Sequence, residues 1–136
     1  MVPNYQLIPY CDHAKAIYGD CMRTCVASLL NLEPEDVPHF LHDNSDEWLP
    51  RLNAWLAPRK LAYLVFGVGE ASVWVDIMKR AGQDLFHLIT IESATSGVLH
   101  QIIGRNGKPY WCPILGNVQG RDYEMLEFGF LVITSL

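Results

Sequence analysis

Apolar side chains recur three or four positions apart in three segments of the chain, which is the spacing of one face of a helix. The first segment runs from Cys21 to about Asn31, the second from Trp48 to Leu56, and the third from Ser72 to Arg80. The first segment has apolar residues over a wide face. The pattern therefore predicts three helices, of which the first is buried.

β-Branched and aromatic residues fill five other segments, as is typical of strands. These segments are Leu61 to Phe66, Leu85 to Ile91, Val98 to Ile103, Pro109 to Cys112 and Met125 to Thr134. Turn-forming residues separate the last four of them at Ser93 to Gly97, Arg105 to Gly107 and Gly116 to Arg121. Helices first and strands afterwards predict an α+β fold, with an antiparallel sheet packed on the helices.

Cys21 stands where a loop turns into the first helix, and Asp20 before it is expected to be the N-cap. The first turn would then direct unpaired N–H groups and the positive end of the helix dipole at the Cys21 sulfur, which favours the thiolate. Cys21 is therefore a candidate nucleophile.

A capping box of Asn44 and Glu47 is predicted for the second helix.

The turn at Asn106 and Gly107 decides which residue faces His100. If these two residues alone form the loop, Cys112 lies on the opposite face of the hairpin from His100. If Arg105 joins the loop, the register shifts by one and Cys112 lies directly opposite His100. The sequence allows both registers, so the partner of His100 stays open.

Length, charge and hydropathy exclude several classes of protein. The 136 residues, half of them hydrophobic, suit a single domain that spans residues 1–136 and has its own core. The formal charge is −5 and Lys and Arg form no cluster, so neither nucleic acid nor an anionic membrane is an expected partner. No apolar run reaches the roughly 18 residues of a membrane span, and the first residues lack the pattern of a secretion signal. We expect a cytoplasmic protein.

The four cysteines in such a chain are expected to be free thiols, nucleophiles or metal ligands rather than disulfide partners. Three of them, with one histidine, make a Cys₃His set suited to zinc: Cys21, Cys25, His100 and Cys112. Zinc binding is thus one alternative. The Cys-x₃-Cys spacing is looser than the Cys-x₂-Cys pairs of structural zinc sites, so we expect no metal or other cofactor.

Two stretches carry a resemblance to a known family. Gly19 to Phe40 reads GDCMRTCVASLLNLEPEDVPHF, and His100 to Pro113 reads HQIIGRNGKPYWCP. Together they resemble a group of small papain-like cysteine proteins of bacteria and phages, related to bacteriocin-processing peptidases. In that group a Gly-(Asp/Asn)-Cys opens the central helix, and a strand-borne histidine leads through a Gly-containing hairpin to Asp-Pro. The resemblance places the nucleophile at Cys21 and the histidine at His100.

Two positions depart from the pattern of the group. Cys112 stands where the group has the Asp before Pro, and Lys15 stands six residues before Cys21, where a papain-type glutamine would donate to the oxyanion. The group that orients the His100 imidazole is therefore expected to be Cys112 or Asn117, whose amide oxygen accepts an imidazole N–H.

The resemblance implies a papain-like fold, with the helix of Cys21 in an N-terminal helical part that packs on a C-terminal antiparallel sheet bearing His100. It implies a cysteine-dependent hydrolase or acyl transferase that acts on an amide, thioester or isopeptide bond, with Cys21 as nucleophile and His100 as base. The substrate is then a protein or peptide, and the chain is expected to be a phage protein acting in the host cytoplasm. The alternative is an inactive papain-like domain that binds a partner protein. The two departures from the pattern favour this alternative.

Overall fold

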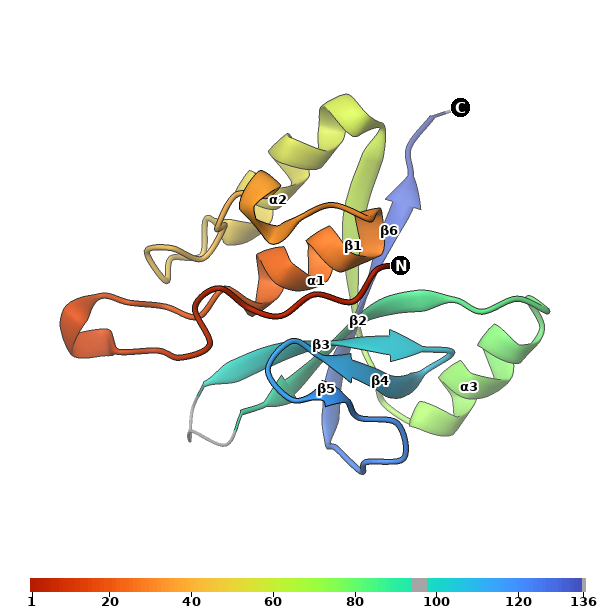
Figure 1. Ribbon diagram of the computed structural model, residues 1–136. Coiled ribbons are helices and arrows are strands. Elements are labelled where there is room, and N and C mark those ends of the chain that lie inside the picture. The colour runs from red at the N-terminus through yellow and green to blue at the C-terminus, as the bar shows by residue number, and fades with distance from the viewer. Residues whose placement is uncertain (94–97, 136) are drawn as a thin grey trace.

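A computed structural model describes residues 1–93 and 98–135 of the chain (Figure 1). The α-helices in this part are α1 (Cys21–Leu30), α2 (Trp48–Leu56) and α3 (Ala71–Lys79), and the short 3-10 helices are η1 (His13–Lys15), η2 (Pro34–Asp36) and η3 (Ala57–Arg59). The strands are β1 (Leu61–Gly67), β2 (Phe86–Glu92), β3 (Leu99–Arg105), β4 (Lys108–Cys112), β5 (Gly116–Asn117) and β6 (Met125–Ile133). Helices α1 and α3 and five of these strands agree with the predicted segments within two residues, whereas α2 begins three residues later than a capping box at Asn44 predicts. The turn predicted at Ser93 to Gly97 falls, apart from Ser93, outside the described residues.

The strands form one sheet in the order β1-β6-β2-β3-β4-β5, and each neighbouring pair is antiparallel. The prediction of an α+β fold with an antiparallel sheet is therefore confirmed. Strand β5 was not predicted, because its two residues, Gly116 and Asn117, are turn formers in the sequence.

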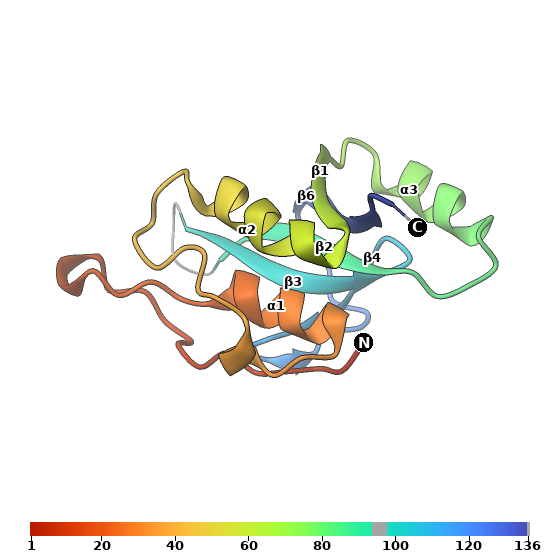
Figure 2. The ribbon, with the colours of Figure 1, turned by 90° about the horizontal axis from the view of Figure 1, so that it is seen from above.

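Apolar clusters cover both faces of the sheet. Helices α1 and α2 pack on one face, where the buried residues include Met22, Val26, Leu52, Leu88 and Ile103. Helix α3 packs on the other face, where they include Met78, Ile89, Ile102, Cys112 and Phe128. Figure 2 shows α1 running along β3, and the two elements are in contact. This packing brings the first turn of α1 close to the start of β3.

Asp20 precedes α1 but makes no capping hydrogen bond, so the prediction of an N-cap side chain is wrong. Its fully buried carboxylate instead accepts the Ile8 N–H at 2.9 Å and the Arg23 Nε–H at 2.8 Å. A buried carboxylate needs such partners, and the N-terminal segment supplies one of them. Asp20 therefore fixes residues far apart in sequence beside the start of α1.

The capping box predicted for α2 is also absent. Asn44 has a positive φ of 53°, and α2 starts at Trp48 with no side-chain capping bond. The loop before α2 is held instead by Arg51, which donates two hydrogen bonds of 2.8 Å to the Asp43 carboxylate. This ion pair lies at the surface, and its two parallel hydrogen bonds fix how the Arg51 guanidinium is oriented against the Asp43 carboxylate.

The β3–β4 hairpin contains the two-residue turn that one of the two registers required. Asn106 and Gly107 both have positive φ, 52° and 83°, as a type I′ turn demands. Next to the turn, Arg105 pairs with Lys108 and Gly104 with Pro109. The two-residue loop is therefore correct at the turn itself.

A β-bulge then changes the register farther along the hairpin. Ile103 pairs with Trp111, which leaves Tyr110 as the extra residue of β4. Because side chains alternate along a strand, this extra residue moves Cys112 onto the face of His100. The inference that a two-residue loop separates Cys112 from His100 is therefore wrong, and the bulge is the reason.

Candidate functional site

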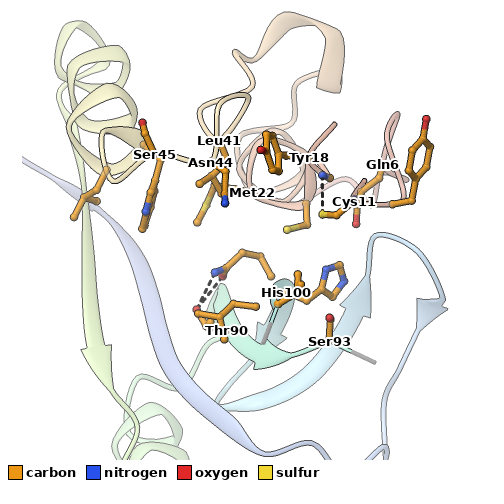
Figure 3. A pocket seen from close by; sticks show the side chains of 18 of the residues that line it. Gln6, Cys11, Tyr18, Met22, Leu41, Asn44, Ser45, Thr90, Ser93 and His100 are labelled. Carbon is orange, nitrogen blue, oxygen red and sulfur yellow. Dashed lines mark hydrogen bonds between the residues drawn. The ribbon is translucent and has the colours of Figure 1, made fainter. Parts of the chain in front are cut away.

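A cavity of about 590 Å³ lies between the helical layer and the sheet, and its volume is in the range of ligand sites. The residues that line it come from the N-terminal segment, the start of α1, the loop before α2, and strands β1, β2, β3 and β6. Figure 3 shows Gln6, Cys11 and Tyr18 on one wall, with Thr90 and His100 on the opposite wall. The cavity is therefore walled by segments from both halves of the chain.

Cys21 is the first residue of α1 and lines this cavity. Its side chain is only 7% exposed, and burial raises the pKa of the thiol to about 11, although the Gln101 N–H opposes the shift. Cys21 is therefore a neutral thiol at pH 7. The thiolate expected from the helix start is wrong for the free protein, because desolvation outweighs the nearby N–H groups.

His100 is the second residue of β3 and also lines the cavity. Its Nε2 lies 3.5 Å from the Cys112 Sγ, and burial lowers the pKa of the imidazole to about 4. His100 is therefore neutral at pH 7 and able to accept a proton. No hydrogen bond between His100 and Cys21 occurs among the described residues. Both line the cavity, but His100 lies on the face of β3 that carries Ile102 and Cys112, and α1 packs on the other face.

Of the two groups proposed to orient His100, the fold brings only Cys112 to it. Asn117 is exposed, its Oδ1 accepts the Gln119 N–H at 2.9 Å, and its backbone pairs with Trp111. That pairing places Asn117 on the other face of the hairpin from Cys112. The assignment of Asn117 to the site is therefore wrong, and its amide serves the local turn.

The geometry does not support the zinc alternative. Cys25 is fully buried beside Cys21 and Cys112, its Sγ donates to the Gln101 carbonyl at 3.5 Å, and burial raises the pKa of its thiol well above the ordinary value. In residues 1–93 and 98–135, no group of three or more His, Cys, Asp and Glu side chains is arranged to hold a metal ion.

Gln6 lines the same cavity and was missed in the sequence. Its Nε2 donates to the Ile8 carbonyl at 2.8 Å, and a Cβ on Gly19 would lie 3.4 Å from that nitrogen. Its Oε1 is buried and has no hydrogen-bond partner among the described residues. The Gln6 amide thus lies beside Gly19, which precedes Cys21 by two residues in the chain.

The reason Gln6 was missed is an excursion of the chain. Residues 8–18 form this excursion, with η1 at the tip and a β-bridge between Asp12 and Ile17 at the base, and part of it lines the cavity. Lys15, six residues before Cys21, lies in this excursion and is exposed. A search at fixed spacing therefore found Lys15, whereas a search for any glutamine upstream of the excursion finds Gln6.

Within the described residues, no helix has both the length and the apolar character to cross a membrane. No protein-family model, curated protein or solved structure was found to match the chain.

Proposed function

We propose that the protein is a papain-like, cysteine-dependent hydrolase or acyl transferase that acts on an amide, thioester or isopeptide bond of a protein or peptide. The observation that carries the proposal is that Cys21, at the start of α1, and His100, near the start of β3, line one cavity of about 590 Å³. The order of Cys before His and the packing of the cysteine helix on an antiparallel sheet support the same assignment.

The chemistry assigns one task to each group. The Cys21 sulfur attacks the acyl carbon while His100 removes the thiol proton, and His100 returns that proton to the leaving nitrogen, oxygen or sulfur. Water or a second acceptor then releases the acyl group from Cys21. Backbone N–H groups at the start of α1 and the Gln6 amide are available to stabilise the oxyanion.

The neutral state of both groups determines how this chemistry starts. Because burial raises the pKa of Cys21 to about 11 and lowers that of His100 to about 4, the free protein favours the neutral pair over a thiolate–imidazolium pair. The free protein therefore holds a thiol and an imidazole. Proton transfer accompanies attack on the substrate, as in general-base catalysis, and does not precede it.

The second candidate is an inactive papain-like domain that uses the cavity to bind a partner protein. One observation favours it: Cys112 supplies a thiol where a carboxylate would hold the imidazole and favour its protonated form. On this account the cavity binds a peptide segment and leaves its bonds intact.

Acetylation by p-nitrophenyl acetate separates the two candidates. Trypsin cuts after Lys15 and Arg23, so Cys21 is the only cysteine on the peptide of residues 16–23 and its acetylation is read directly by mass spectrometry. An enzyme acetylates Cys21 faster than a free thiol does and loses this advantage in His100→Ala. The control is His42→Ala, because His42 is exposed and lies outside the cavity. Acetylation no faster than in denatured protein contradicts the enzyme and leaves the binding domain.

A further inference from the structure

A second thiol lies on the wall of the cavity at the base of the excursion. The Asp12 N–H and the Ile17 carbonyl are joined at 2.7 Å, and the Ile17 N–H and the Asp12 carbonyl at 3.0 Å. These bonds run the chain back on itself, so that Cys11 lies beside Gly19. The Cys11 Sγ accepts the Gly19 N–H at 3.2 Å, as the dashed line in Figure 3 shows.

The position of Gly19 brings Cys11 close to Cys21. The chain from Gly19 to Cys21 spans at most about 7 Å. Because the Cys11 sulfur lies 3.2 Å from the Gly19 nitrogen, it lies within roughly 10 Å of the Cys21 backbone. Both residues line the cavity.

The other two cysteines are excluded from this pairing by burial. Cys25 is 0% exposed and Cys112 is 3% exposed, and neither lines the cavity. Cys11, by contrast, is exposed to solvent. An oxidant that enters from solvent therefore meets Cys11 first, and the thiol that shares its cavity is Cys21.

We infer that Cys11 and Cys21 are a peroxide-sensitive pair that forms a disulfide across the wall of the cavity. The Cys11 sulfur attacks one oxygen of hydrogen peroxide, which breaks the O–O bond, releases water and leaves a sulfenic acid on Cys11. The Cys21 sulfur then attacks the Cys11 sulfur and expels a second water as the S–S bond forms. Two thiols are oxidised by two electrons and one peroxide is reduced.

The disulfide blocks the sulfur of Cys21 and draws the excursion against the start of α1. A dithiol reductant reverses it, so the pair is suited to a reducing compartment that is transiently oxidised. The inference does not rest on the proposed function, because the bond forms whether or not Cys21 acts on a substrate.

Peptide mass spectrometry tests the pair directly. The native protein is treated with dilute hydrogen peroxide, remaining thiols are blocked with N-ethylmaleimide, and the unreduced protein is cut with trypsin. The four cysteines fall on four different peptides, 1–15, 16–23, 24–51 and 106–121, so each possible disulfide has its own mass. We expect a monomer 2 Da lighter than the reduced protein, with peptides 1–15 and 16–23 linked.

Three variants control the result. Cys11→Ser and Cys21→Ser each abolish the linked species, whereas Cys112→Ser, a matched change of a buried thiol, retains it. Circular dichroism of each variant identifies any that fails to fold, and Cys11→Ser, an exposed position, keeps the test valid in that event. The inference is overturned if peroxide gives only sulfinic acid on Cys11, a bond to Cys25 or Cys112, or no change.

Discussion

The His100 imidazole faces the Cys112 thiol, with 3.5 Å between Nε2 and Sγ. The contact exists because the bulge at Tyr110 brings Cys112 onto the face of His100. A thiol is a weak hydrogen-bond partner. Burial therefore determines the pKa of His100, which is about 4 rather than the ordinary 6.5.

Replacing Cys112 by Asp is expected to raise the pKa of His100. A carboxylate within about 4–6 Å favours the imidazolium, by one to three units in comparable pairs. Each unit makes proton transfer from Cys21 roughly tenfold more favourable at equilibrium. A fraction of this gain enters the rate of general-base catalysis, so acetylation of Cys21 at pH 7 should speed up by about 3-fold or more. The pKa is read from an NMR titration of the imidazole resonances, and the rate from peptide mass spectrometry.

Cys112→Asn is the matched control for this change, since it has the size of Asp without the charge. It should leave the pKa of His100 low and the acetylation rate close to that of the native protein. Equal behaviour of the Asp and Asn variants would mean that charge beside Nε2 does not govern His100.

Gln6→Ala is expected to slow acetylation of Cys21 by about 100-fold, as loss of an oxyanion donor does elsewhere. Alkylation by iodoacetamide builds up no oxyanion, so its rate at Cys21 should stay unchanged. The ratio of the two rates therefore isolates the role of the Gln6 amide. A parallel fall in both rates would instead show that Gln6 only holds the cavity wall in place.

His87 makes folding stability depend on pH. The ring is fully buried, Nδ1 bonds to the Leu88 carbonyl, Nε2 accepts the Gly107 N–H, and burial lowers the pKa to about 4. The unfolded chain, with a pKa near 6.5, binds a proton that the folded chain does not. The free energy of unfolding should therefore fall as the pH drops from 6.5 to 4, by about 3 kcal/mol from this residue, with no slope from it above 6.5.

Urea unfolding at several pH values measures this slope. His87→Gln keeps an oxygen acceptor for the Gly107 N–H but does not titrate, so its slope should be shallower than that of the native protein. Burial also lowers the pKa of His100, so His100 makes the free energy of unfolding fall with pH in the same direction. Part of the pH dependence should therefore remain in His87→Gln. An unchanged slope in His87→Gln would contradict the assignment.

Asp20→Ala should destabilise the protein by about 3 kcal/mol, because it removes a buried carboxylate from Arg23 and from the Ile8 N–H. Hydrogen exchange at the Ile8 amide should accelerate at the same time. Asp43→Asn is the control, since it breaks an exposed ion pair with Arg51 and should change stability little. Similar stability of the two variants would rule out a structural role for the buried carboxylate.

Local patterns predicted the fold well because each helix and long strand carries its own periodicity. The Asn106-Gly107 turn was also readable, because a type I′ turn needs two residues with positive φ. The bulge could not be read from the sequence, because nothing in the residues around Tyr110 distinguishes an extra residue from a paired one. That single residue decides whether Cys112 faces His100.

The site was less predictable than the fold because its contacts join distant segments. The Asp20 carboxylate was expected to cap α1, but the tertiary partner Ile8 takes the hydrogen bond that a local cap would make. Gln6 enters the cavity from beyond an excursion whose length no spacing rule anticipates. The pKa of Cys21 depends on burial, and a sequence motif carries no measure of burial.

The most direct test of the central claim, that His100 is the base for Cys21, is the pH dependence of Cys21 acetylation by p-nitrophenyl acetate. The account predicts a rate that rises as His100 loses its proton near pH 4, stays level through neutral pH, and falls sharply in His100→Ala but not in Asn117→Ala. The contrary result is an acetylation rate that rises steadily with pH toward the Cys21 pKa of about 11 and is equal in the native protein and His100→Ala. That result would contradict the account.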